Sequence, residues 1–108
     1  MIRERDRRGA IEQLKAAIES FPEFALAYNE LGIQYIMLRE YDSALEALRT
    51  ALKIKPDYYD ARLNVGVTFY RRREYADAEK ELREAVKLRD QSAAVRYYLG
   101  MVLANQGR

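Results

Sequence analysis

The chain has 108 residues and a net charge of +2, and with 49% hydrophobic and 33% charged residues it has the composition of one small, helix-rich globular domain. The absence of cysteine excludes disulfides and thiol nucleophiles, and the absence of histidine removes the usual general base and the commonest transition-metal ligand. The small net charge gives no basis for binding to nucleic acid or an anionic membrane, and no stretch approaches the roughly 20 apolar residues that span a bilayer.

The first predicted element covers residues 1–24. Met1 to Gly9 is too charged for a secretory signal, so a cytoplasmic location is expected. Ala10, Leu14 and Ala17 recur at spacings of four and three, which places them on one face of a helix. The segment that ends at Pro22 is therefore predicted to be helical, with a solvated start in which acidic and basic residues mix.

Residues 25–58 are predicted to form a pair of helices. Between Leu26 and Leu38 the apolar residues are spaced by three to five, as on one helix face, and the pattern returns from Ser43 to Ile54. Acidic residues precede the second helix, where they complement the positive end of its dipole. Pro56 cannot continue that helix, so Lys55 to Asp57 is predicted to be the connector.

Residues 59–92 repeat the pair 34 residues later. This places helices at about Asp60 to Arg72 and Ala76 to Leu88. Ser92 is a candidate N-cap for a last helix within residues 93–108, because its hydroxyl can accept a hydrogen bond from a free backbone N–H. The chain is therefore predicted to contain two helical hairpins flanked by single helices.

A period of 34 residues runs through the whole chain, and Gly32, Gly66 and Gly100 mark it most clearly. Residues that recur at the same period are Ala10, Ala44 and Ala78; Leu14, Leu48 and Leu82; Ala17, Ala51 and Ala85; and Arg5, Arg39 and Arg73. Glycine inside a helix costs about 1 kcal/mol relative to alanine, so its recurrence indicates close helix crossings. We expect Gly32 to face Ala44, and Gly66 to face Ala78.

This chain resembles the tetratricopeptide repeat family, whose unit is 34 residues of two antiparallel helices. The first full unit carries the family pattern in Tyr28, Leu31, Gly32, Tyr35, Tyr41, Ala44, Leu48, Ala51 and Pro56. The second keeps it, except that Arg62 replaces an aromatic residue and Asp90 replaces proline. The resemblance implies an all-α fold, a right-handed superhelical stack of antiparallel helix pairs with about six helices. In this single array, residues 1–24 are the second helix of a preceding repeat, 25–58 and 59–92 are full repeats, and 93–108 are the first helix of a following one.

The resemblance also implies a function as a protein-interaction scaffold. In the family, the first helices of the repeats line a concave groove that binds a peptide or a helix of a partner protein. The positions of this chain that match the groove are Asn29, Ile33, Met37, Leu63, Asn64, Val67, Tyr70, Arg71, Tyr97, Tyr98 and Met101. For Ile33, Val67 and Met101 the alternative is ordinary packing between hairpins. Such packing is not expected to explain the residues at four other positions, Asn29, Asn64, Tyr70 and Arg71.

Some members of the family grip the acidic C-terminal tails of heat-shock chaperones with a clamp of lysine, asparagine and arginine side chains. The matching positions here are Asn29, Ile33, Asn64, Ala94 and Tyr98. Only Asn64 fits the clamp. We therefore expect no binding of chaperone tails.

Catalysis and nucleic-acid binding find little support. The sequence has no glycine-rich phosphate loop, and its acidic residues have basic neighbours three or four positions away on helices, so we expect no enzyme activity, metal or cofactor. Arg71 to Arg73, beside Tyr70, resembles a basic patch with an aromatic residue. Basic residues are favoured at a helix C-terminus by the dipole, and Arg73 belongs to the recurring series, so a structural role explains the run better.

The terminal helices suggest an alternative function. Ala93 to Ala104 is apolar on more than one side, and in a repeat array such a face is covered by the next helix. The first helix of one chain's last half-repeat is complementary to the second helix at the start of another chain. The alternative is therefore a structural or assembly element that forms homo-oligomers through its terminal half-repeats.

Overall fold

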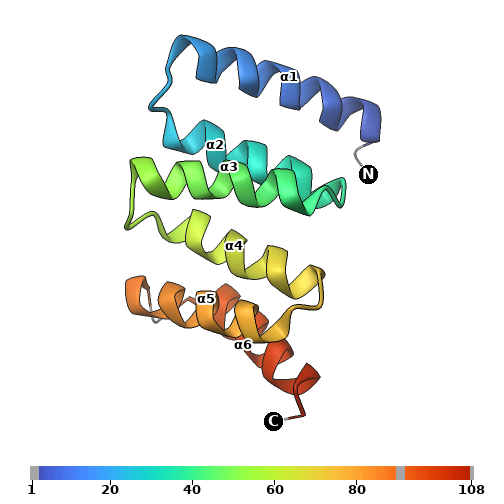
Figure 1. The fold of residues 1–108 in the computed structure, drawn as a ribbon, viewed down its shortest axis with the longest axis vertical. Helices are drawn as coiled ribbons and strands as arrows, with labels where there is room; N and C mark the ends of the chain where they lie inside the picture. Colours follow the sequence, from blue (N-terminus) through green and yellow to red (C-terminus); the bar gives the residue numbers. More distant parts are fainter. Residues whose placement is uncertain (1–2, 90–91, 108) are drawn as a thin grey trace. The chain divides into compact units, whose positions relative to one another are not determined.

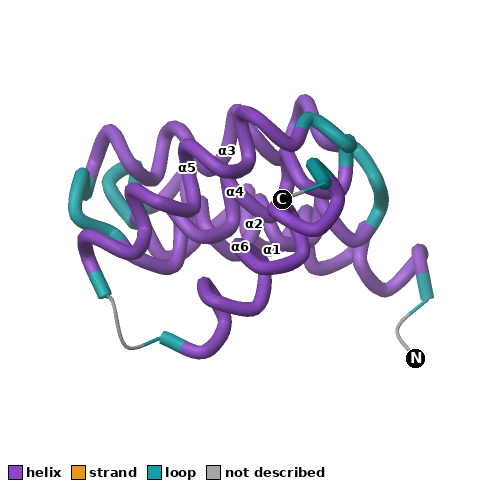
Figure 2. Tube along the Cα trace, turned by 90° about the horizontal axis from the view of Figure 1, so that it is seen from below, coloured by secondary structure: helices purple, strands orange, loops and turns teal. Residues whose placement is uncertain are grey.

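A computed structural model describes residues 3–89 and 92–107, and in this part of the chain it contains six helices and no strand (Figures 1 and 2). The helices are α1 (Glu4–Ser20), α2 (Ala25–Met37), α3 (Tyr41–Ile54), α4 (Tyr59–Arg71), α5 (Tyr75–Leu88) and α6 (Ala93–Asn105). They divide into two compact units, α1 to α3 in residues 1–56 and α4 to α6 in residues 57–108. None of the described helices has the length and apolarity needed to cross a membrane.

The predicted helices are confirmed, but α3 begins at Tyr41 rather than Ser43. The reason is the tight turn that ends α2. Arg39 adopts a left-handed conformation with φ of 62°, its N–H donates to the Ile36 carbonyl at 3.0 Å, and the N–H of Glu40 donates to the Tyr35 carbonyl at 2.9 Å. This pair of bonds is a Schellman motif, which reverses the chain at once and lets the next helix start without a longer loop.

The same turn joins α4 to α5. Arg73 has φ of 66°, its N–H donates to the Tyr70 carbonyl, and the N–H of Glu74 donates to the Phe69 carbonyl at 2.9 Å. The recurring arginine at positions 39 and 73 therefore occupies the one site in each hairpin where glycine is the usual residue. Arg5 has the same phase in the sequence but lies within α1, so it does not share this conformation.

Replacing Arg73 or Arg39 by glycine is expected to raise the free energy of unfolding by about 0.5–1 kcal/mol. The left-handed conformation costs an L-residue about 1–2 kcal/mol, and the greater backbone entropy of unfolded glycine offsets part of the gain. Urea denaturation measures the change. Arg5→Gly is the matched control and should destabilise, because it puts glycine inside a helix. Equal losses in all three variants would contradict the account.

In the first unit, α1 packs onto the α2–α3 hairpin through one fully apolar contact. Ile11 of α1 is buried against Leu31 of α2 and Ala47 of α3. The partly buried residues around this cluster are Leu14, Ile18, Tyr35 and Leu38. Of the predicted face residues Ala10, Leu14 and Ala17, only Leu14 packs against this cluster. The buried residue of α1 is Ile11, which the recurring spacing did not single out.

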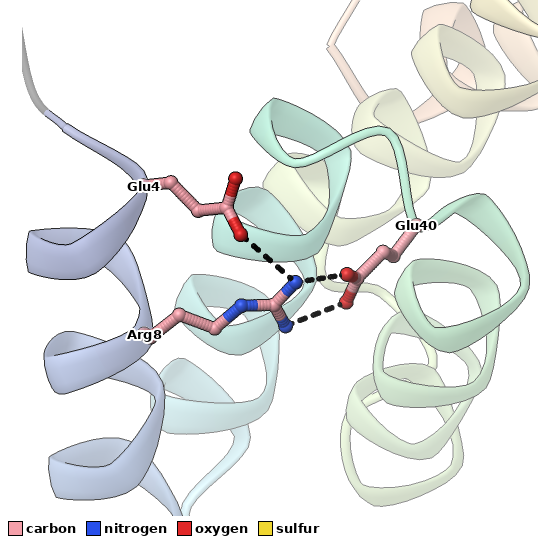
Figure 3. A network of polar contacts seen from close by, with 3 residues as sticks. All are labelled: Glu4, Arg8 and Glu40. Carbon is pink, nitrogen blue, oxygen red and sulfur yellow. Dashed lines mark hydrogen bonds and ion pairs between the residues drawn. The ribbon is translucent and has the colours of Figure 1, made fainter.

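An ion pair ties the start of α1 to the α2–α3 turn (Figure 3). The two guanidinium nitrogens of Arg8 donate to the two carboxylate oxygens of Glu40, with 2.9 Å from Nη1 to Oε1. Glu4, one turn before Arg8, lies 3.7 Å from Nη2. The hydrogen bonds from Arg8 hold the pKa of the Glu40 carboxyl below its ordinary value of 4.5.

This pair makes the docking of α1 sensitive to acid. Because the pKa of Glu40 is lower in the folded state, its stabilising contribution is present above pH 4.5 and is lost as the pH falls through the lowered pKa. Glu40→Gln should therefore melt at a lower temperature than the original chain near pH 7, and the difference should become smaller when the pH is lowered to 3. A constant difference at both pH values would show that the carboxylate charge is not involved.

The second unit is built around Leu82 of α5. Leu82 is fully buried together with Ala78 and Ala85 of the same helix and Val95 and Val102 of α6. Ala85 thus belongs to the same buried cluster as two residues of the following helix. Tyr59 completes the buried cluster.

The two glycines at helix crossings do not face the residues that the spacing predicts. A Cβ at Gly32 would lie 2.6 Å from Cγ and Cδ2 of Leu48, and a Cβ at Gly66 would lie 2.7 Å from the same atoms of Leu82. The prediction that Ala44 and Ala78 face these glycines is therefore wrong. The residue that faces each glycine is the buried leucine four positions later in the second helix of the hairpin. A Cβ at Gly100 would meet no atom of the described residues within 4 Å.

The predicted N-cap of α6 is confirmed. The Ser92 hydroxyl accepts from the N–H of Val95 at 3.5 Å, and Tyr59 donates its own hydroxyl to Ser92. The start of α6 is thereby fixed to α4, the first helix of this unit. Asp90, which replaces the expected proline, lies outside the described residues.

Candidate functional site

An aromatic cluster joins α4 and α6 in the second unit. The rings of Tyr70 and Tyr98 meet edge to face, with centroids 6.0 Å apart, and Tyr97 meets Tyr98 in the same way at 5.2 Å. Tyr70 also contacts Tyr75, the first residue of α5, at 6.0 Å. Tyr70 and Tyr98 are half-buried against the core around Leu82, so the packing of the unit holds the rings in place.

Tyr97 is the exposed member of this cluster. Its side chain is 62% exposed, although it rests on the half-buried ring of Tyr98. A rigid, exposed aromatic ring on an ordered base loses little conformational entropy when it binds. The cluster of Tyr70, Tyr97 and Tyr98, here called the tyrosine surface, is therefore suited to contact a partner.

Arg71 follows Tyr70 at the end of α4 and is exposed. Within residues 3–89 and 92–107, no acidic side chain forms an ion pair with it. A guanidinium in this position can donate two hydrogen bonds to a carboxylate. Arg72 differs, since its Nε lies 2.6 Å from the Glu74 carboxylate. Within the arginine run, Arg72 therefore forms a structural ion pair, Arg73 holds the left-handed turn, and Arg71 is exposed at the end of α4.

The other predicted residues of α4 and α6 are less accessible. Val67 is buried, and Leu63, Asn64 and Met101 are half-buried. Leu63 packs against the core of the unit, as Tyr70 and Tyr98 do. Burial favours a packing role for Val67, which was the alternative for that position.

On α2, in the first unit, the three predicted residues differ in exposure. Asn29 is only 3% exposed, Ile33 is half-buried, and Met37 is exposed. Ile33 and Met37 lie one turn apart on the same helix face. The burial of Asn29 favours a structural role for its amide, and Ile33 with Met37 forms the accessible apolar part of this face.

Two features were missed from the sequence. Arg62, which replaces an aromatic residue of the family pattern, donates from Nη1 to Oε1 of Glu81 at 3.3 Å and so links α4 to α5. The connection between α1 and α2 exposes Phe21 and Phe24. The signal for the second was present, since position 21 carries phenylalanine where the repeat has Lys55 and Arg89.

Comparison with known proteins identifies the repeat. The family model described as Tetratricopeptide repeat matches residues 2–59, 34–93 and 63–108, in three overlapping windows that together cover nearly the whole chain. The chain belongs to the tetratricopeptide repeat family. No curated protein matches the sequence of this tetratricopeptide repeat chain.

Solved structures agree on the fold. The first tetratricopeptide domain of Spaghetti (RPAP3), bound to the HSP90 peptide SRMEEVD, is 14% identical with a TM-score of 0.90, over 95% of this chain and 82% of that one. The Arabidopsis OM64 domain is 18% identical, with a TM-score of 0.88 over 93% and 83%. The second domain of human RPAP3, in complex with the HSP70 peptide SGPTIEEVD, is 16% identical, with a TM-score of 0.79 over 85% and 77%. At these identities the likeness shows the fold alone.

Proposed function

We propose that this tetratricopeptide repeat chain binds a peptide or a helix of a partner protein on the faces of its first helices, and carries out no catalysis. The observation that carries the proposal is the tyrosine surface, with exposed Tyr97 fixed on the edge-to-face pair of Tyr70 and Tyr98. Two structures with the same fold hold peptides, which supports a peptide ligand here.

The chemistry of the surface favours a ligand with an apolar side chain and an acidic group. Tyrosine rings bury apolar side chains, and their hydroxyls can hydrogen-bond a peptide backbone. Arg71, the exposed residue after Tyr70 at the end of α4, supplies a cation for a carboxylate. In the first unit, Met37 and Ile33 are the accessible apolar positions on α2. The other positions of the predicted set are Asn29, Leu63, Asn64, Val67 and Met101.

Selection from a library of random peptides displayed on phage tests this function. Peptides that bind the chain saturably should lose about tenfold or more in affinity to Tyr97→Ala and to Arg71→Ala, measured by calorimetry. Leu88→Ala is the matched control, because Leu88 is an exposed apolar residue on the second helix α5, and it should leave the affinity unchanged. If the selected peptides bind Tyr97→Ala and Arg71→Ala with unchanged affinity, the proposed site is refuted.

Chaperone tails are expected not to bind. The clamp of the family needs cationic or amide side chains where this chain has Ile33, Ala94 and Tyr98. Arg71 can pair with only one of the several carboxylates of an acidic tail, so the others would be desolvated without partners. Fluorescence anisotropy with labelled SRMEEVD, the peptide held by Spaghetti, should show no saturation at micromolar protein. Micromolar affinity would contradict this prediction.

Self-association is the second candidate function, and the space around Gly100 favours it. Gly32 and Gly66 are each covered by a buried leucine, whereas no described residue covers Gly100. In α1, Leu14 has the same phase in the repeat as these two leucines, and it is only half-buried. In this proposal α1 of a second copy covers Gly100 of the first. Light scattering should then show a mass that rises with concentration and returns to the monomer in Gly100→Glu. A strict monomer at high micromolar concentration rules it out.

A further inference from the structure

The connection between α1 and α2 carries a second surface, distinct from the proposed groove. Three of the large apolar residues that the structure exposes lie within six positions: Phe21 is 66% exposed, Phe24 41% and Leu26 51%. Phe21, Phe24 and the residues between and before them line an open hollow of about 800 Å³. This group of Phe21, Phe24 and Leu26 is called the phenylalanine surface. Contiguous exposed apolar groups of this kind mark interaction sites.

The turn itself does not require phenylalanine at position 21. Phe21, Lys55 and Arg89 are the C-cap residues of α1, α3 and α5, with φ and ψ of −134° and 81°, −135° and 90°, and −156° and 88°. In each, the cap N–H donates to an alanine carbonyl four residues before, at 2.8–3.0 Å. Two of the three copies of this conformation therefore use a cation, and the exposed phenylalanine adds nothing to the turn.

The next two positions depart in the same direction. Phe24, Tyr58 and Ser92 are the N-cap residues of the following helices, and only Ser92 accepts a hydrogen bond with its side chain. Leu26 stands where α4 has Asp60, an acid that favours the helix dipole. Phe24 and Leu26 give neither the capping bond that Ser92 provides nor the favourable charge that Asp60 provides, and this connection has an apolar residue at all three positions.

The charged residues nearest in sequence to the phenylalanine surface are of one sign. Between Ala16 and Leu38 the chain has no lysine or arginine, and it has the acids Glu19, Glu23 and Glu30. Neither Glu19 nor Glu23, which flank Phe21, forms an ion pair with any residue that the structure describes. A partner that buried the phenylalanines would place its own charges against these carboxylates, which selects for cations.

We propose that the phenylalanine surface binds a protein segment in which apolar side chains are flanked by lysine or arginine. The rings of Phe21 and Phe24 supply the apolar area, and Glu19 and Glu23 at the rim supply the charge complementarity. An anionic lipid surface does not fit, because its headgroups would meet the carboxylates of Glu19 and Glu23.

The test uses two synthetic amphipathic helical peptides that share their leucine and tryptophan positions, one with lysine and one with glutamate at the polar positions. The lysine peptide should bind saturably and shift the amide resonances of residues 19–26. Phe21→Gln with Phe24→Ser should weaken it about tenfold or more, since neither change alters the charge and serine is a working N-cap at Ser92. Glu19→Gln with Glu23→Gln should weaken it several-fold and reduce its dependence on salt.

Tyr97→Ala should leave binding of the lysine peptide unchanged, so loss of the proposed groove function and loss of this surface are separable. Matched unfolding curves of the variants and the original chain establish that the fold is retained. The proposal is overturned if the lysine peptide does not bind, if the glutamate peptide binds as well, or if removing both rings has no effect. If the chain co-sediments with phosphatidylserine vesicles and does not bind the lysine peptide, the phenylalanine surface binds membranes rather than a protein segment.

Discussion

Leu82→Ala is expected to lower the free energy of unfolding by about 2–5 kcal/mol, and Leu48→Ala by a similar amount. Both side chains are fully buried, and both lie across the glycine of the first helix in their hairpin. Truncation removes apolar contacts and leaves a cavity that the backbones of two closely crossing helices cannot fill. Urea denaturation followed by circular dichroism measures the loss.

Leu14→Ala is the matched control for this prediction. Leu14 has the same phase in the repeat as Leu48 and Leu82, but it is only half-buried at the edge of the α1 contact. Its removal should cost less than half as much, because the solvent already reaches part of the side chain. If all three leucine substitutions lowered the free energy of unfolding equally, burial at the glycine crossing would not explain the contribution of the recurring leucine.

Gly32→Ala and Gly66→Ala are expected to destabilise the chain by up to about 2 kcal/mol each. The added Cβ would lie 2.6 Å from Cγ of Leu48 or 2.7 Å from Cγ of Leu82, well inside van der Waals contact. The crowding costs about 1–3 kcal/mol, and it exceeds the gain in helix propensity of about 1 kcal/mol. Thermal and urea unfolding both report the net change.

Gly100→Ala isolates the propensity gain. At the same repeat position in α6, the new methyl group would have no described atom within 4 Å, so this substitution should raise the free energy of unfolding by up to about 1 kcal/mol. A close helix crossing at Gly66 therefore predicts changes in the free energy of unfolding of opposite sign for Gly66→Ala and Gly100→Ala. If Gly66→Ala also stabilised the chain, the close approach of α4 and α5 would be refuted.

The helical hairpins could be predicted from the sequence because the 34-residue period repeats residue types that differ in size and polarity. The helix starts were less predictable. Tyr41 begins α3 because Arg39 adopts a left-handed conformation, and arginine gives no signal for that conformation as glycine would. A helix end that depends on one left-handed residue cannot be predicted from the sequence when that residue is not glycine.

The partner of each glycine also depended on tertiary geometry. The period shows that Gly32 needs a close neighbour, but the crossing of two helices decides whether Ala44 or Leu48 is that neighbour. At the candidate site, the sequence placed Tyr70 and Tyr98 on the first helices, but not their edge-to-face contact. Exposure was the least predictable property, since Asn29 is buried and Phe21 is exposed. The assignment of residues 1–108 to a single array and the binding roles of the groove residues stay predictions.

The most direct test of the interaction function is a map of amide chemical shifts in the chain as a selected peptide is added. We expect saturable changes centred on Arg71, Tyr97 and Tyr98. Changes confined to the second helices α3 and α5, or no saturation with any selected peptide, would contradict it.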